Sequence, residues 1–214
     1  MRTNTTETKL YRLLCHFFEN QKYQLLAEKK QFRKLTANGF LNVVFSITEY
    51  APNDAWVEVH FGSHNRHIEQ IAQQFLTTNL LDFRQDANTL IVSLGKYNDV
   101  KYFRYKIQNE EDLQNTCELI AAFFEQTGFA FLTNLDSVAA IDKALNATHR
   151  QPCKFVYNQI HRCFKGIIAA KLNNSPQFTE LAEVYQLYLR QHANAHEQAQ
   201  FDKLLAYLWH YSAN

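Results

Sequence analysis

The sequence predicts an α+β protein: an antiparallel sheet of four or five strands flanked by helices, with an all-helical C-terminal extension. Near the N-terminus, Leu10, Leu14 and Phe18 recur at helical spacing and form one apolar stripe. From about residue 22 the apolar period falls to two, which is typical of strands with one buried face. After Pro152 the helical period returns.

Length and composition suit a protein with its own apolar core. A chain of 214 residues with 46% apolar content can bury such a core without disulfides or metals. We expect an α+β domain over residues 1–147 and a helical extension over residues 148–214, with the boundary at 147–152. An extension of about 60 residues rarely folds alone, so we expect it to pack on the α+β domain.

The first half contains signals for two helices and three strands. The first helix begins after an N-cap in the Thr5–Thr6 pair, because a threonine oxygen accepts a free N–H of the first turn. The strands are expected at Lys29–Lys34, Phe40–Tyr50 and Trp56–Phe61, with a turn at Ala51–Asp54. Gly62–Ser63 is expected to end the third strand, and a helix with Ile68, Ile71 and Phe75 on one face to follow.

The second half adds two strands and further helices. The strands are expected at Thr89–Leu94 and Val100–Ile107. Helices are expected at about 110–127 and 136–146, and three more are expected after Pro152. We expect Asn109 to cap the first of these helices and Gly128 to follow its end as a C′ glycine. Ser175 and Pro176 are expected to start the second of the three C-terminal helices.

Charge and motif content exclude several classes of protein. The 22 Lys and Arg against 21 Asp and Glu give a net charge of +1, which argues against nucleic-acid binding. Neither G-x-G-x-x-G nor G-x-x-x-x-G-K-[ST] occurs, and we expect no cofactor. There is no signal-peptide-like or membrane-spanning apolar run, and the four cysteines include no C-x-x-C. We therefore expect a cytoplasmic protein with reduced thiols and no membrane contact.

One cluster of metal-compatible residues lies where the third strand meets the following helix. Glu58 and His60 share a strand face, and His64 and His67 are spaced to share a face of the first helical turn. Imidazoles with a carboxylate suit zinc or iron, so a metal-dependent hydrolase is one hypothesis. The alternative is a set of solvated or hydrogen-bonded side chains at a junction.

A second histidine pair has an explanation in local structure. His192 and His196 have the i, i+4 spacing of a helical metal pair, but Ala193 stands where a metalloprotease needs glutamate. Asn194 and Glu197 have the spacing of a capping box, which predicts a helix start between the histidines.

Bases alternate with aromatic residues in the segment 101–106. If it is a strand, Tyr102, Arg104 and Lys106 share one face, an arrangement that single-stranded nucleic-acid binding uses. The alternative is an amphipathic strand with a charged, solvated face.

The sequence contains many aromatic residues and no catalytic motif. Tyr207, Trp209 and Tyr211 belong to the last helix, and Tyr and Trp are common anchors of protein interfaces. The leading hypothesis is a non-enzymatic module that binds another protein, or a second copy of itself. The alternative for these residues is that they close the core.

The order of elements resembles small uncharacterised bacterial α+β proteins of the domain-of-unknown-function type. The segments that carry the resemblance lie within about residues 7–146: Lys29–Lys34, Phe40–Tyr50, Val57–Gly62 with Ile68–Ile71, Glu110–Leu113 and Gly128–Leu132; a weaker similarity covers Phe164–Leu172. The resemblance transfers no catalytic residue. Some proteins of this look are thought to neutralise toxins, which implies a binding, immunity-like role.

Overall fold

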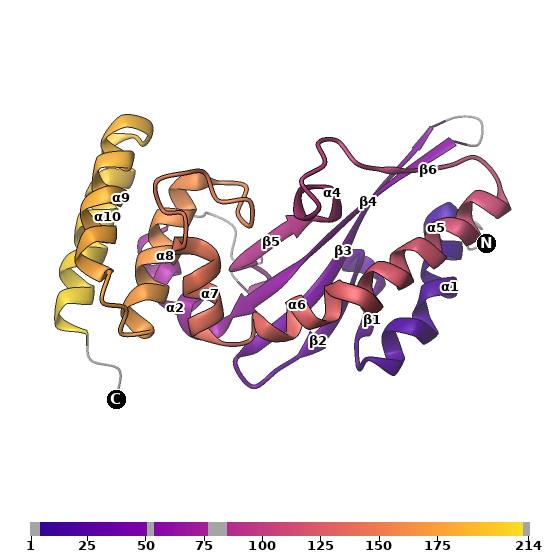
Figure 1. Ribbon diagram of the computed structural model, residues 1–214, viewed down its shortest axis with the longest axis horizontal. Coiled ribbons are helices and arrows are strands. Elements are labelled where there is room, and N and C mark those ends of the chain that lie inside the picture. The colour runs from indigo at the N-terminus through magenta and orange to yellow at the C-terminus, as the bar shows by residue number, and fades with distance from the viewer. Residues whose placement is uncertain (1–4, 51–53, 77–84, 212–214) are drawn as a thin grey trace. The chain divides into compact units, whose positions relative to one another are not determined.

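The computed structural model describes residues 5–50, 54–76 and 85–211 and confirms the α+β class (Figure 1). An antiparallel sheet has the strand order β1-β2-β3-β4-β5, and β6 also pairs with β4. The strands are β1 (Gln24–Leu26), β2 (Gln31–Leu35), β3 (Gly39–Tyr50), β4 (Asp54–Asn65), β5 (Leu90–Ser93) and β6 (Tyr105–Ile107).

The helices of the described chain are connected to these strands and to one another by turns and loops. They are α1 (Thr6–Asn20), η1 (Ala27–Lys29), α2 (Arg66–Phe75), α4 (Leu94–Tyr97), α5 (Glu110–Phe123), the π-helical turn η2 (Phe124–Gly128), α6 (Phe129–Asn134), α7 (Val138–Asn146), α8 (Gln159–Leu172), α9 (Phe178–His192) and α10 (Ala195–His210). None of these helices is long and apolar enough to cross a membrane.

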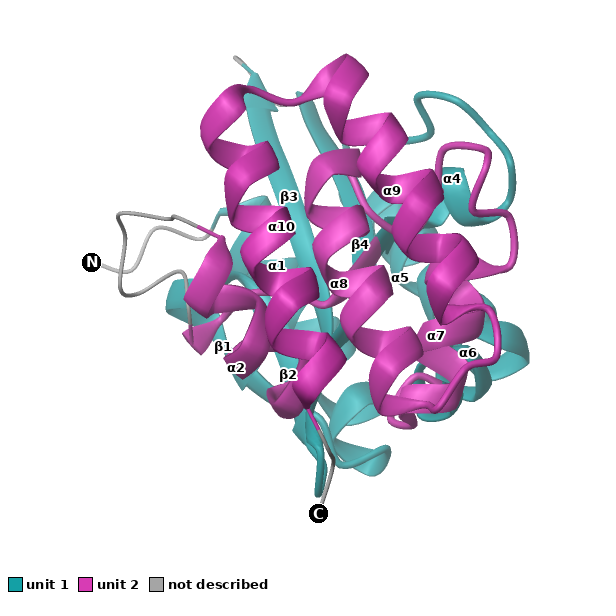
Figure 2. Cartoon of the chain, turned by 90° about the vertical axis from the view of Figure 1, so that its left-hand side faces the viewer, with its two compact units in different colours: residues 1–63, 92–134 teal, residues 64–91, 135–214 magenta. Residues whose placement is uncertain are grey.

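The chain forms two compact units, coloured separately in Figure 2. Unit 1 comprises residues 1–63 and 92–134, and unit 2 comprises residues 64–91 and 135–214. The chain passes from one unit to the other near the end of β4, within β5, and between α6 and α7. The boundary expected between residues 147 and 148 lies inside unit 2, which contains both α7 and α8.

Unit 1 packs helices against one face of the sheet through aromatic rings. In the β2–β3 register Phe32 lies opposite Val43, so these residues point to the same face. Phe18 of α1 stacks on Phe32 with ring centroids 4.4 Å apart and meets Phe124 edge-on at 5.4 Å. Phe61 of β4 also meets Phe124 edge-on, at 5.6 Å. The core of unit 1 therefore lies between the sheet, α1 and η2.

Unit 2 is built around α8. All nine residues from Arg162 to Ala170 are buried, which is the pattern of a helix that has neighbours on every side. Those neighbours are α2, α7, α9 and α10 (Figure 2). Because even Arg162 and Lys165 are buried, the interior of this unit must supply them with polar partners.

Several predicted helix starts are confirmed. The side-chain oxygen of Thr5 accepts the N–H of Thr8, and that of Asn109 accepts the N–H of Asp112. Asn194 and Glu197 form the predicted capping box, with both reciprocal hydrogen bonds present.

The expected end of the third strand is wrong. β4 runs through Gly62–Ser63 to Asn65, whose side chain then caps α2 by accepting the N–H of Ile68. The helix therefore begins where the Asn cap is, three residues after the glycine. The turn expected at Ala51–Asp54 lies largely outside the described residues.

Two further element boundaries are wrong. The strand expected at Val100–Ile107 is formed only from Tyr105, because Tyr102 has a left-handed backbone with φ of 58°. The N-cap of α9 is Gln177, so Ser175 and Pro176 precede the helix.

Gly128 was expected as a C′ glycine, but it lies inside continuous helix between η2 and α6. A Cβ at this position would lie 2.5 Å from the ring of Phe124. Glycine is therefore required for close ring packing, not to stop the helix.

Candidate interaction surfaces and the polar pocket

The structure places the four predicted metal ligands in three different environments. His60 Nε2 lies 3.7 Å from Glu58 Oε1 on the partly exposed face of β4. His64 Nδ1 is hydrogen-bonded to the carbonyl of Ala87 at 2.6 Å. His67 Nε2 is hydrogen-bonded to the Tyr211 hydroxyl at 2.6 Å.

The arrangement around His60 is that of a structural contact. Burial lowers the pKa of His60, although Glu58 opposes this shift, and the nearby Arg104 lowers the pKa further. Among the residues that the structure describes, no group of three or more His, Cys, Asp or Glu side chains is arranged to hold a metal ion. Glu58, His60, His64 and His67 therefore do not form one coordination set.

The residues predicted to form a nucleic-acid-binding face, Tyr102, Arg104 and Lys106, do not all lie on one strand. Tyr102 lies in a turn, whereas Lys106 lies in β6. Arg104 Nε lies 3.3 Å from Glu58 Oε2, and Lys106 Nζ lies 3.1 Å from Asp54 Oδ2. Both cations are thus already opposite carboxylates, which weakens their attraction for phosphate.

The aromatic residues of the last helix lie on two sides of its buried stripe. Tyr207 packs against Phe75 of α2 at a centroid distance of 5.7 Å, and Tyr211 lies 5.5 Å from Tyr207. Trp209 lies on the other side of the stripe and meets the buried Phe178 edge-on at 5.1 Å. Tyr207 and Trp209 are both exposed, and 53% of Trp209 is accessible to solvent.

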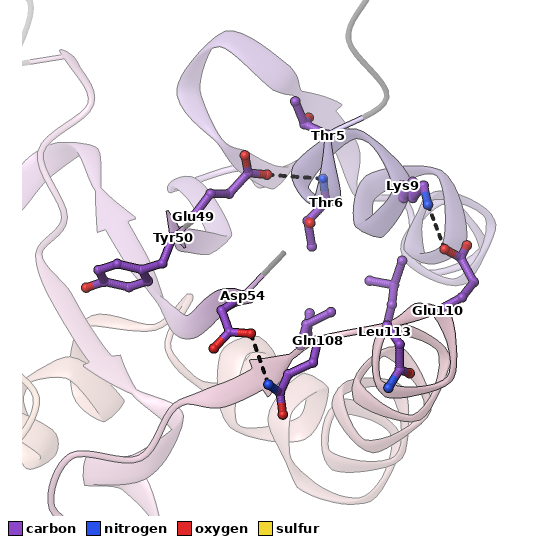
Figure 3. Close-up of a pocket in the computed structure, with 11 residues that line it drawn as sticks. Thr5, Thr6, Lys9, Glu49, Tyr50, Asp54, Gln108, Glu110 and Leu113 are labelled. Carbon is purple, nitrogen blue, oxygen red and sulfur yellow. Dashed lines mark hydrogen bonds and ion pairs between the residues drawn. The ribbon is translucent and has the colours of Figure 1, made fainter. Parts of the chain in front are cut away.

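A polar pocket of about 430 Å³ lies in unit 1 (Figure 3). It is lined by the starts of α1 and α5, the end of β3 and the start of β4. Its carboxylates come from three elements and are Glu49, Asp54 and Glu110.

Each of these carboxylates has a partner in the pocket wall or beside it. Glu49 Oε1 accepts the backbone N–H of Thr6 at 3.1 Å, and Glu110 Oε2 lies 2.6 Å from Lys9 Nζ. Asp54 accepts a hydrogen bond from Gln108 at 3.0 Å, and this bond, followed by the contact with Lys106, lowers the pKa of Asp54. The pocket walls are therefore held together by internal ion pairs and helix-capping contacts.

A buried polar network in unit 2 was missed by the sequence-based prediction. Lys165 Nζ lies 2.9 Å from Glu69 Oε1 and donates to the carbonyl of Asn88 at 2.6 Å. The Thr89 hydroxyl also donates to Glu69, at 2.9 Å. The signal available in the sequence was a lysine inside the apolar run Phe164–Ala170.

The guanidinium of Arg162 forms a second buried polar contact set. It donates to the carbonyls of Leu145 at 2.9 Å and Thr148 at 3.1 Å, and also to the carbonyl of Gln151. These are carbonyls at and after the end of α7, where positive charge is favoured. Arg162 therefore fixes the path of the chain between α7 and α8.

Cys15, Cys117 and Cys163 are poor nucleophiles. All four cysteines lie within the described residues, and none of them forms a disulfide. Burial raises the pKa of Cys117 and Cys163 to about 12, and a hydrogen bond to Glu19 raises the pKa of Cys15 to about 11. Thiols with such pKa values stay protonated at neutral pH and are not activated for attack.

Comparison with protein-family models, with curated proteins and with solved structures finds no match to this chain. What the protein does is therefore inferred from its own residues.

Proposed function

We propose that the protein is a non-enzymatic protein-binding module that contacts its partner through the exposed aromatic residues of α10. The observation that carries the proposal is Trp209, which is half-exposed yet held edge-on against the buried Phe178. A tryptophan fixed in this way offers a large apolar contact at little cost in side-chain entropy.

The neighbouring residues support the same surface. Lys171 Nζ lies 5.4 Å from the ring centroid of Phe178, so a cation is close to the base of the tryptophan. Tyr207 and Tyr211 add polar hydroxyls at the other edge of α10, and Tyr211 is oriented by its hydrogen bond to His67. An apolar anchor with polar residues beside it is the usual composition of an interface.

The resemblance to small bacterial proteins adds one class of partner. Some proteins of that look are thought to neutralise toxins, so a toxin that this protein would bind and inhibit is the first class to test. The other partner to test is a second copy of the chain, which the experiment below would detect.

The test is native mass spectrometry of the untagged protein and of affinity-captured complexes from lysate of the source cells. We expect the wild type to retain a stoichiometric protein that Trp209→Ala loses. Tyr157→Ala is the matched control, because Tyr157 is a comparably exposed aromatic residue, 51% accessible, that does not belong to α10. A wild type that is monomeric and retains no stoichiometric protein contradicts the proposal.

Elemental analysis of the same sample tests the metal-dependent alternative. A stoichiometric metal that is lost on His60→Ala or His64→Ala would contradict the proposal of a non-enzymatic module and would direct attention to hydrolase activity.

A further inference from the structure

A small cavity lies within unit 2, between the segment 149–152 and helices α8 and α9. Its volume is about 50 Å³, which is room for a few water molecules or for one small ligand. The residues that line it are His149, Arg150, Gln151, Pro152, Gln159, Arg162, Cys163, Tyr185 and Tyr188. Among the described residues this lining includes two arginines and no aspartate or glutamate, so the cavity favours an anion.

Arg162 brings a buried positive charge to the cavity, since only 4% of the residue is exposed. Its Nε and its two terminal nitrogens each donate one hydrogen bond to a carbonyl, those of Leu145, Gln151 and Thr148. A guanidinium carries five N–H groups, so one remains on each terminal nitrogen. No carboxylate of the described residues pairs with Arg162. A charge buried in this way is stabilised further by an anion.

Other polar groups of the lining are used within the protein. The amide of Gln159 donates to the carbonyls of Cys153 and Val156 and accepts the N–H of Cys153. The Tyr185 hydroxyl donates to the Asn146 side chain at 2.5 Å. These bonds hold the walls of the cavity in place, so the donors left for a ligand are those of Arg162.

The second arginine does not add to the charge inside the cavity. Arg150 Nη2 lies 2.9 Å from Glu180 Oε1, and His149 Nε2 lies 3.3 Å from the same oxygen. Glu180 is not part of the lining. Because Arg150 is neutralised from outside the cavity, a ligand meets the single positive charge of Arg162, which one negative charge balances.

We propose that this cavity binds a small monocarboxylate, of the size of acetate or propionate, through the two remaining N–H groups of Arg162. The planar guanidinium has a donor on each terminal nitrogen, which suits the two oxygens of a carboxylate. The rings of Tyr185 and Tyr188 and the Pro152 ring line the same cavity and offer apolar contact to a short hydrocarbon group. The inference is independent of the proposed function, because it concerns a ligand site and not the exposed aromatic residues of α10.

The first test compares acetate with acetamide, which has almost the same size and no charge. A ligand of four non-hydrogen atoms reaches a Kd on the order of 1 mM in such a site. About 100 mM sodium acetate should therefore raise the thermal midpoint of the full chain by about 5 °C over the same concentration of sodium chloride. Adding acetamide to the chloride sample should change the midpoint by less than about 1 °C. An unchanged midpoint in acetate, or an equal rise with acetamide, overturns the proposal.

The second test locates the site. In protein labelled with ¹⁵N-arginine, the Nε–Hε NMR signal of Arg162 should shift with the same acetate dependence as the thermal midpoint. Arg162→Lys keeps the charge but removes the planar fork, so acetate should bind at least about tenfold more weakly. Arg190→Lys is the matched control, because Arg190 is an exposed arginine of α9 outside the lining, and should bind acetate like the wild type.

Three results would overturn the carboxylate site. The first is an Arg162 signal that acetate leaves unmoved, which the wild type alone reveals even if circular dichroism shows that Arg162→Lys does not fold. The second is a folded Arg162→Lys that keeps the full rise in midpoint, because acetate would then act elsewhere on the protein. The third is inorganic phosphate that binds at least about tenfold more tightly than acetate, since a dianion would then be the preferred ligand.

Discussion

The two units of this chain solve the problem of a stable interior differently. Unit 1 fills the space between sheet and helices with aromatic rings, of which Phe18 touches both Phe32 and Phe124. Unit 2 places charged groups at its centre, where Lys165 pairs with Glu69 and both are almost fully buried. Ring packing depends on shape and volume, whereas a buried ion pair is stable only when both charges are present.

This difference predicts which substitutions destabilise each unit most. A cavity in unit 1 removes contacts in proportion to the volume lost. Removal of one charge in unit 2 leaves the other charge without a partner in a medium that solvates it poorly. The following experiments would break or sharpen this contrast.

The largest expected effect is in the aromatic core of unit 1. Phe18→Ala should lower the free energy of unfolding by about 4 kcal/mol, because it removes a fully buried ring from the centre of the cluster. Urea unfolding followed by circular dichroism measures this change. Leu13→Ala on the exposed side of the same helix is the control and should cost less than about 1 kcal/mol. Equal losses in the two variants would contradict the assignment of the core.

Breaking the ion pair of unit 2 should lower the free energy of unfolding by a similar amount, and a second substitution should restore most of it. Lys165→Met leaves Glu69 buried without its cation and should cost about 3 kcal/mol in urea unfolding. Adding Glu69→Gln removes the stranded charge and keeps an acceptor for Thr89, so the double variant should regain most of that loss. If the double variant is less stable than Lys165→Met alone, the two charges do not form the dependent pair described here.

The helix caps should give a smaller effect that is similar in the two units. Asn109→Ala removes the cap of α5 in unit 1, and Asn194→Ala removes the cap of α10 in unit 2. Each should lower the free energy of unfolding by about 1 kcal/mol. Asn109→Asp and Asn194→Asp retain an accepting oxygen and should keep nearly all the stability. If the aspartate variants lost as much stability as the alanine variants, the caps would not stabilise the helices by accepting a hydrogen bond.

The smallest effect is expected from two partly buried histidines, one in each unit. Burial lowers the pKa of His60 and of His161, and nearby Arg104 and Lys165 act in the same direction. A histidine with a lowered folded-state pKa takes up its proton more readily when unfolded. Stability should therefore be fully present above the unfolded pKa of about 6.5 and decline as the pH falls below it.

Urea midpoints between pH 7.5 and pH 5 measure this decline. His60→Gln and His161→Gln should each flatten it, because the amide does not titrate in this range. If a variant made the decline steeper, the pKa of the substituted histidine would be raised by folding and not lowered.

Local chemistry predicted the fold where a feature depends on residues close in sequence. The caps at Asn109 and Asn194 were predicted because the capping oxygen and the backbone N–H that donates to it are three residues apart. Gly128 was assigned to the wrong role because the contact that requires it, with the ring of Phe124, depends on the path of a continuous helix. The Lys165–Glu69 pair joins residues 96 positions apart, which no local pattern specifies.

The candidate surfaces follow the same division. The aromatic character of Tyr207, Trp209 and Tyr211 is visible in the sequence, but the burial of Phe178 beneath Trp209 is known only from the structure. Alternation in the segment 101–106 predicted a strand face, whereas the left-handed backbone of Tyr102 separates that side chain from those of Arg104 and Lys106. Composition therefore identified the candidate residues, and backbone conformation determined which of them lie together.

The three passages of the chain between the units have a genetic consequence. Neither unit is encoded by one uninterrupted stretch of codons, since residues 64–91 of unit 2 and residues 92–134 of unit 1 alternate. One contiguous gene segment that encodes all of unit 1 must also encode residues 64–91 of unit 2, and one that encodes all of unit 2 must also encode residues 92–134 of unit 1. Neither unit can therefore be moved to another gene as one fragment without carrying part of the other unit with it.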